Sequence, residues 1–360
     1  MAFVASKSEW AELCTFFQLL NEGKVALGNA EGKPSGKAWP IAMVQRVEHD
    51  GVRCYYIEEN EIHVKGEGID RRFMREDFTY AAEKLVEVLK TPGTEVESPE
   101  GMEGFLDEIG IYNLEAQTDD RTDMYLAFFS ADAPLVGMRI YSKMPGMHSL
   151  LDGGRAANIK FEQVGIRFPS PTVNKINQLE TNNVVLDRIS LIERLGGQLK
   201  FNDAADKIFR SNLHMIDLHF PRMVGEMART MYLEDVSKVS ELVERIKEQN
   251  PLKIKDELIR KHGYYEYKMK EFLLALANGL RPAKLYNGTE SQIDGMLLLD
   301  GDGNVLCYNK ANRQAYADFL YYNSRLEKGD MIKDKYGVLE RENGLFYFKL
   351  NLKIGLKVKN

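Results

Sequence analysis

The amino-acid sequence predicts a mixed α/β protein, and two kinds of pattern support this prediction. Apolar residues recur at helical spacing in several segments, the first of which contains Trp10, Leu13, Phe16, Phe17 and Leu20. Short apolar runs bounded by turn residues predict strands, as at 42–48 and 53–57 on either side of Asp50-Gly51. At 360 residues, with 44% hydrophobic and 28% charged residues, the chain can bury a substantial core.

Composition also sets the expected compartment. The opening MAFVASKSEW lacks the pattern of a signal peptide, and no apolar run approaches the roughly 18 residues that span a bilayer. Three widely separated cysteines argue against a disulfide framework, so we expect a cytoplasmic protein. The net charge of −6 gives no support to nucleic-acid binding by itself.

The first part of the chain should contain helices and one hairpin. A helix is expected from Ser8 to Leu20, and the hairpin follows at 42–57. A second helix is expected from Phe78 to Lys90, ended by Thr91-Pro92-Gly93. Ser98-Pro99 predicts the N-cap and first residue of a short helix that runs to Ile109.

Strands should then dominate, followed by helices. We expect strands at 111–117, 123–130, 135–142 and 157–164, and a mainly helical region from about 175 to 280. That region includes amphipathic helices at 236–246 and 272–280. The last 70 residues return to strands, with 320–323 inside a helix. The expected division is an N-terminal α/β extension (1–92), a core (93–170) and a C-terminal helical and β region (171–360).

The core contains a candidate site. Asp123 opens one expected strand, and Arg139, Tyr141 and Lys143 share one face of the next. Metal-dependent nucleases use such a layout, because a carboxylate can hold a divalent ion while a lysine orients water or offsets developing charge. Spacing alone leaves a second interpretation open, in which Asp123 belongs to a turn and Lys143 is a solvated strand end.

Motifs over about 330 residues indicate a family. They are SEWAEL and FFQLLNEGKV near the N-terminus, DDRTDM, GMRIYS and SLLDGGRAANIKFE in the core, and FRSNLHMIDLHFP, DGMLLLDGDGNVLCYNKANR, FLYYNSRLE and GLFYFKLNLKI in the C-terminal half. In this order and spacing the chain resembles the HpaII-type restriction endonucleases.

The resemblance implies a PD-(D/E)XK-like mixed-sheet nuclease core with further N-terminal and C-terminal α/β regions. It implies cleavage of double-stranded DNA with Mg²⁺, with the palindrome CCGG as the expected target. Asp123 matches the metal-binding aspartate of the family. A cytosine methyltransferase is the expected functional partner, and a homodimeric assembly is left open.

One position departs from the family pattern. The strand that usually reads Ser-Ile-Lys-Ser is Arg139-Ile140-Tyr141-Ser142 here, so Tyr141 stands in the place of the catalytic lysine. Lys143 lies two residues further on the same face, about 7 Å away, and Arg139 offers a charge from the other side. Two hypotheses follow: an active nuclease with a migrated lysine, or a protein that binds DNA without cutting it.

The remaining expectations concern DNA contacts and further carboxylates. Asn312 and Arg313 are candidates for base or phosphate contacts, although they would also suit an ordinary helix start. Phosphate contacts are expected from four lysines: Lys333, Lys335, Lys349 and Lys353. Glu103 and Glu108 are candidates for a second metal-binding carboxylate. A structural protein without a DNA role is a third hypothesis, favoured only by the acidic net charge.

Overall fold

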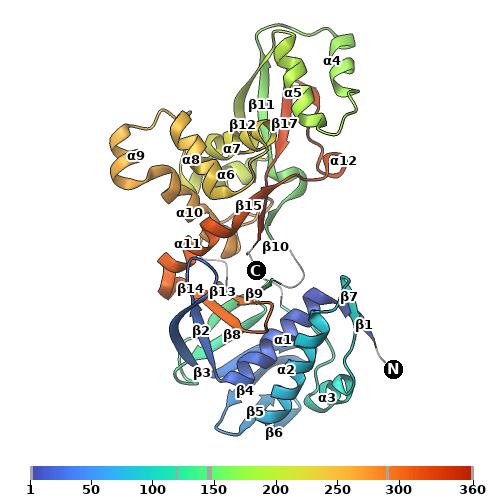
Figure 1. The fold of residues 1–360 in the computed structure, drawn as a ribbon, viewed down its shortest axis with the longest axis vertical. Coiled ribbons are helices and arrows are strands. Elements are labelled where there is room, and N and C mark those ends of the chain that lie inside the picture. The colour runs from blue at the N-terminus through green and yellow to red at the C-terminus, as the bar shows by residue number, and fades with distance from the viewer. Residues whose placement is uncertain (1–2, 119–120, 144–147, 289–291, 358–360) are drawn as a thin grey trace.

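The computed structural model describes residues 3–118, 121–143, 148–288 and 292–357, and it confirms the mixed α/β class. Figure 1 shows two lobes along the long axis of the molecule, one built mainly from the first 142 residues and the other mainly from residues 148–288. The chain crosses between the lobes more than once, because residues 293–309 return to the first lobe before the C-terminal strands enter the second.

A nine-stranded sheet organises the first lobe. Its strands are β2 (Lys24–Gly28), β3 (Pro34–Glu48), β4 (Gly51–Ile57), β5 (Glu61–Gly66), β6 (Ile69–Met74), β8 (Met124–Phe128), β9 (Val136–Ser142), β13 (Ile293–Leu299) and β14 (Val305–Asn309). They follow the order β2-β14-β13-β9-β8-β3-β4-β5-β6. The pairs β13–β9 and β14–β2 are parallel, and the other pairs are antiparallel.

The long strand β3 gives this sheet its shape. Its first half pairs with β2, and its second half pairs with β8 and β4. Strands β2, β14, β13, β9, β8 and β3 therefore close into a ring of hydrogen-bonded neighbours. The hairpin of β3 and β4 and the adjacent strands β8 and β9 confirm the strands expected at 42–57 and 123–142.

Three helices pack on the sheet of the first lobe: α1 (Lys7–Glu22), α2 (Arg75–Leu89) and α3 (Met102–Ile109). A capping box starts α1, because the Glu9 amide donates to Ser6 Oγ (3.3 Å) and the Ser6 amide donates to Glu9 Oε2 (2.8 Å). Gly23, with φ 59°, ends the helix and donates to the Leu19 carbonyl. The buried face of α1 includes Trp10, Phe16 and Phe17.

The second lobe contains two smaller sheets. The first has the order β12-β11-β17-β16 and the second the order β10-β18-β15. Their strands are β10 (His148–Asp152), β11 (Asn158–Val164), β12 (Gln198–Ala204), β15 (Ser324–Glu327), β16 (Leu339–Glu342), β17 (Leu345–Asn351) and β18 (Lys353–Leu356). A short pair, β1 (Val4–Ser6) with β7 (Glu95–Glu97), lies apart near the N-terminus.

The remaining helices belong mainly to the second lobe, and the one formed by residues 313–323 also packs against β14 of the nine-stranded sheet (Figure 1). They are α4 (Ser170–Asn177), α5 (Val184–Arg194), α6 (Lys207–Ile216), α7 (Phe220–Glu234), α8 (Val239–Gln249), α9 (Asp256–His262), α10 (Tyr264–Ala277), α11 (Arg313–Asn323) and α12 (Met331–Asp334), with 3-10 turns η1 (Gly154–Ala157) and η2 (Lys310–Asn312). No helix in the described part of the chain is long and apolar enough to cross a membrane.

Several sequence expectations need correction. Residues 111–117 form no strand, because the Leu114 carbonyl and the Ala116 amide bind side chains instead of a neighbouring strand. The helix expected from Pro99 starts at Met102, after Gly101 with φ 82°. Strand β12 lies within the region expected to be helical. The helix expected at 236–246 is α8, which starts three residues later.

Two buried apolar clusters divide between the lobes. Strand β9 supplies both, because Met138 belongs to the cluster of the first lobe and Tyr141 to that of the second. The lobes therefore meet at the strand that carries the candidate site. The domain boundaries after residues 92 and 170 stay predictions.

Candidate functional site

A cavity of about 260 Å³ opens beside the start of β8. Helix α1 contributes Glu12 to its wall, the loop before β8 contributes Glu115 and Asp123, and β9 contributes Arg139 to Ser142. Ser149, on β10, closes the side nearest the second lobe. The cavity thus lies where α1, β8 and β9 meet, and it brings together Asp123, Arg139 and Tyr141 as the sequence predicted.

Asp123 is held by the backbone of β9. Its amide donates to the Met138 carbonyl (3.0 Å), and its Oδ2 accepts from the Ile140 amide (2.6 Å). Burial raises the pKa of Asp123 to about 6, although the Ile140 hydrogen bond and the Arg139 charge act in the opposite direction. The carboxylate therefore has a fixed position and a high cost of ionisation.

Glu12 is the second carboxylate of the cavity. Its Oε1 accepts from Arg46 Nη2 (3.2 Å) and from the Ala116 amide (2.7 Å). Burial raises the pKa of Glu12 to about 8, and the charge of Asp123 adds to this effect. The charge of Asp123 therefore disfavours ionisation of Glu12, and the charge of Glu115, the third carboxylate of the cavity, disfavours ionisation of Asp123.

These carboxylates suit a hard divalent cation. Mg²⁺ prefers oxygen ligands and is commonly held by one or two carboxylates together with substrate phosphate, without a complete cage of protein ligands. No group of three or more His, Cys, Asp or Glu side chains within the described ranges is arranged to hold a metal. Glu12 and Asp123 fit such an ion because a positive charge between them would remove the cost of ionising both.

The Arg46 guanidinium holds Glu12 in this arrangement. It is fully buried and pairs with Glu48 (2.9 Å) as well as with Glu12. It also donates to the Leu114 carbonyl. Tyr55 completes the network by donating from its hydroxyl to Glu48 Oε1 (3.0 Å). Strand β3 is thereby tied to α1 and to the segment that precedes Asp123.

Tyr141 lies against the cavity with 3% of its surface exposed. The Arg139 guanidinium carbon lies 5.6 Å from the centre of its ring. Burial raises the pKa of the Tyr141 hydroxyl, and the Asp123 charge acts in the same direction. The hydroxyl is therefore protonated at neutral pH and can donate a hydrogen bond.

Lys143 lies outside the cavity wall. Its ammonium donates to the Gly32 carbonyl (3.2 Å), and its amide donates to the Leu299 carbonyl (2.9 Å). Burial lowers the pKa of Lys143, whose charged surroundings are Asp300, Lys33 and Asp302. The structure does not bring this lysine beside Asp123, and its catalytic role stays a prediction.

Arginines supply the positive charge near the cavity. Burial lowers the pKa of Arg121, and the charges of Arg281 and Arg139 lower it further. Among the described residues, no carboxylate lies within ion-pair distance of these three guanidinium groups. A phosphate group is the natural counterion for such a set.

The predicted DNA contacts lie away from the cavity and are mostly paired. Asn312 accepts from the Asn309 amide (2.8 Å), and Arg313 pairs with Glu271 (2.6 Å). Lys349 pairs with Glu340 (2.5 Å), and Lys353 pairs with Asp152 (2.7 Å). DNA would have to compete with these acids, and the DNA-binding role of the four residues stays a prediction.

The second carboxylate is not one of the two that the sequence suggested. Glu103 Oε1 accepts from Ser98 Oγ (2.9 Å), and Glu108 lies 3.8 Å from Arg71, so both are engaged elsewhere. Glu12 takes the place beside Asp123. A signal was present in the sequence, because Glu12 is a charged residue between Ala11 and Leu13 on the buried side of an amphipathic helix.

The raised pKa of Glu12 predicts a pH dependence of stability in metal-free protein. The folded state keeps a proton on Glu12 that the unfolded state loses above pH 4.5. The contribution of protonated Glu12 to the free energy of unfolding is therefore lost as pH rises towards about 8. The Glu12→Gln variant should show a shallower fall in unfolding free energy over this range, by on the order of 1 kcal/mol per pH unit. Urea titrations at a series of pH values measure this slope.

The exposed Glu108→Gln variant is the matched control and should keep the wild-type slope. Slopes are compared instead of absolute stabilities, since removing Glu12 also leaves Arg46 with one partner fewer. Equal slopes for wild type and Glu12→Gln would contradict the burial of a protonated Glu12.

Comparison with known proteins concerns the chain as a whole. The profile of the HpaII restriction endonuclease family matches residues 6–356. The type II restriction enzyme HpaII of Haemophilus parainfluenzae is 27% identical over 363 residues, which cover 98% of each chain. No solved structure matches the chain significantly. Because the family profile extends over nearly the whole sequence, the chain belongs to the HpaII restriction endonuclease family.

Proposed function

We propose that the protein is a site-specific deoxyribonuclease that hydrolyses phosphodiester bonds of double-stranded DNA with Mg²⁺, at the palindrome CCGG. Membership of the restriction endonuclease family gives the reaction class. The observation that carries the proposal is the group of three carboxylates, Glu12, Glu115 and Asp123, in one cavity beside Arg139, two of which have raised pKa values. Its placement on a helix and two adjacent strands supports a PD-(D/E)XK-like core.

The residues of the cavity have separate roles in this proposal. Glu12 and Asp123 would hold Mg²⁺, which supplies Lewis-acid activation of the phosphodiester when it is bound. Arg139 and Arg121 orient the phosphate and offset the negative charge that develops on its oxygens. Tyr141, with its protonated hydroxyl, donates a hydrogen bond to water or to a phosphate oxygen.

In this proposal the arginines supply the positive charge that a lysine at position 141 would supply. A guanidinium stays charged at any working pH, so Arg139 provides the positive charge without help from Lys143. Lys143 remains the alternative source of charge, which would require its ammonium to leave the Gly32 carbonyl.

Two partners belong to the proposal. A cytosine methyltransferase would protect host DNA at the same sequence. A homodimer would match the two-fold symmetry of a palindrome and place one cavity at each strand.

A second candidate function is sequence-specific DNA binding without cleavage. Tyr141 favours it, because a tyrosine cannot place a positive charge beside the phosphate. Cleavage in Mg²⁺ separates the two functions, because binding alone would leave the DNA intact.

Incubation with unmethylated plasmid tests the proposed function. With Mg²⁺, wild-type protein should yield discrete fragments, and sequencing of their ends should return CCGG, whereas EDTA should prevent cleavage. The Asp123→Asn variant should cut at least roughly 100-fold more slowly, because it weakens a ligand of the activating ion. The exposed Asp107→Asn variant is the matched control and should cut at the wild-type rate.

Fragments with unrelated ends would contradict the CCGG target. Intact plasmid together with a sequence-dependent mobility shift would instead establish the binding function.

Substitution at position 141 tests the charge argument. Tyr141→Lys should raise the cleavage rate by about tenfold, because it adds a cation next to the phosphate already contacted by Arg139. Tyr141→Phe keeps the ring and loses the hydroxyl, so it should cut more slowly than wild type. Single-turnover rates on a short duplex measure both effects, and a slower Tyr141→Lys enzyme would show that the arginines already fill the role.

A further inference from the structure

A second pocket, of about 200 Å³, lies in the second lobe and shares no residue with the catalytic cavity. The residues before and at the start of α5 form one wall, and Tyr232 of α7 forms another. Lys328 and Gly329, between β15 and α12, close the pocket together with Met331 of α12. Its volume is below the roughly 300–1,000 Å³ of pockets for drug-sized ligands, so a single ring system is a suitable occupant.

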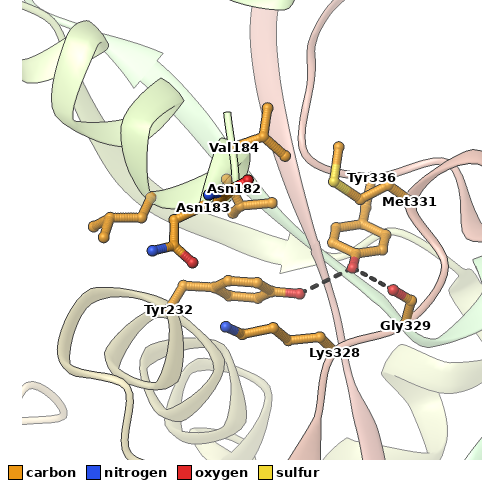
Figure 2. A pocket seen from close by; sticks show the side chains of 10 residues that line it. Asn182, Asn183, Val184, Tyr232, Lys328, Gly329, Met331 and Tyr336 are labelled. Carbon is orange, nitrogen blue, oxygen red and sulfur yellow. Dashed lines mark hydrogen bonds between the residues drawn. The ribbon is translucent and has the colours of Figure 1, made fainter. Parts of the chain in front are cut away.

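Two tyrosines give the pocket a rigid aromatic wall. The Tyr232 hydroxyl donates to the Tyr336 hydroxyl (3.1 Å), which donates to the Gly329 carbonyl (2.7 Å), as the dashed lines in Figure 2 show. Burial raises the pKa of both hydroxyls, so both tyrosines stay neutral. Their hydroxyls are satisfied by this chain of hydrogen bonds, and Tyr232, 6% exposed, offers an occupant only the part of its ring that lines the pocket.

Two asparagines beside this wall can form hydrogen bonds with a heterocyclic ligand. Asn182 and Asn183 are exposed, and their side-chain amides make no hydrogen bond to any described residue. Figure 2 shows the Asn183 amide next to the ring of Tyr232. A carboxamide presents one donor and one acceptor side by side, which matches the hydrogen-bonding edge of a nucleobase.

Lys328 contributes a positive charge to the same pocket. The ammonium of Lys328 lies 5.8 Å from the centre of the Tyr232 ring. Its only ion pair within the described part of the chain is a 3.7 Å contact to Asp235, whose side chain is 94% exposed. Such a weakly held lysine is available to a phosphate.

The rim carries an apolar side chain in an unusual place. Ile332, on α12, is 89% exposed and lies between Met331 of the pocket wall and the exposed Lys333. Asp330 Oδ1 fixes this turn by accepting from the amides of Ile332 (2.9 Å) and Lys333 (3.0 Å). An apolar side chain held in solvent beside lysines has the features of a wedge that inserts between base pairs.

The sheet β10-β18-β15 connects this pocket to the catalytic cavity. Ser149 of the cavity wall is in register with Gly355, which is in register with Arg325. Ser149 is two strand spacings of about 4.8 Å away from Arg325, and Lys328 follows three residues later along the chain. The backbones of Ser149 and Lys328 are therefore roughly 14 Å apart. This is about four base-pair steps at 3.4 Å, so one duplex can reach both.

We propose that this pocket receives one nucleobase turned out of the bound duplex, while Ile332 fills the space that the base leaves. The inference rests on the proposed function, because it requires the protein to bind duplex DNA. Tyr232 stacks on the extruded base, the amide of Asn183 reads its hydrogen-bonding edge, and Lys328 holds the flanking phosphate. A free nucleoside shares this chemistry and is the alternative source of the ring.

Fluorescent base analogues test the inference directly. Pyrrolocytosine or a pteridine analogue of guanine is placed in turn at each position of a duplex with one CCGG site, and wild-type protein is added with Ca²⁺ in place of Mg²⁺. Emission should rise severalfold at one position, because the analogue leaves the base stack. A mobility shift on the same duplex shows independently that it is bound.

Variants connect the signal to the pocket. Ile332→Ala should abolish the rise and weaken binding of the paired duplex about tenfold, because the cost of unpairing is no longer offset. A mismatch at the responding position should restore the affinity of Ile332→Ala for the duplex, because the base is then already unpaired. A mismatch would not restore an affinity that was lost through a merely structural contact. Asn183→Ala should also lower the signal, whereas Leu218→Ala, an exposed apolar control outside the pocket, should not.

The possible failures are distinguishable. A duplex that binds without a rise at any position, or a rise that persists in Ile332→Ala and Asn183→Ala, would overturn the inference and leave the proposed function intact. Equilibrium dialysis that shows binding of free cytidine or guanosine, without a rise in the duplex, would assign the pocket to a free nucleoside. Absence of both binding and cleavage of the duplex would overturn the proposed function and this inference together.

Discussion

The site depends on one buried cation, Arg46. A guanidinium removed from water is tolerated only when its charge and hydrogen-bond donors are matched, and here Glu48, Glu12 and the Leu114 carbonyl provide that match. These contacts join β3, α1 and the segment that leads to Asp123. The position of α1 relative to the sheet is therefore set by electrostatics as well as by apolar packing. Residues 114–116 bind the network through their backbone, and this leaves them outside any strand.

The chemistry of the cavity follows from this constraint. Because Arg46 and the Ala116 amide hold Glu12 in the same cavity as Asp123, the Asp123 charge raises the cost of ionising Glu12, as the Glu115 charge does for Asp123. A divalent ion would reverse that cost, and the arginines near Tyr141 offer charge to a phosphate at the same place. The net charge of −6 is thus no guide to the local field, which is set by a few residues around β9.

Sequence patterns predicted those parts of the structure that depend on local periodicity. The helix stripe of α1, the hairpin of β3 and β4, and Asp123 at the start of β8 were all visible, because alternation and turn residues determine them. Glu12 was missed because its burial arises from a contact with β3, which is distant in sequence. The position of the Lys143 side chain could not be predicted from the sequence either, because it depends on a contact with Gly32 and on the parallel pairing of β9 with β13. Strand β12 alternates between exposed and more buried residues, so its pattern was present in the sequence, and it pairs with β11.

The central claim is that Glu12 and Asp123 together form the catalytic centre. Single-turnover cleavage of a duplex by Glu12→Gln, with Glu108→Gln as the matched control, tests it most directly. The rate should fall by roughly 100-fold or more in Glu12→Gln while the variant still binds DNA in the absence of Mg²⁺, because the substitution removes a carboxylate ligand and leaves the arginines near the cavity in place. A wild-type rate in Glu12→Gln would contradict the account and would place the second carboxylate elsewhere.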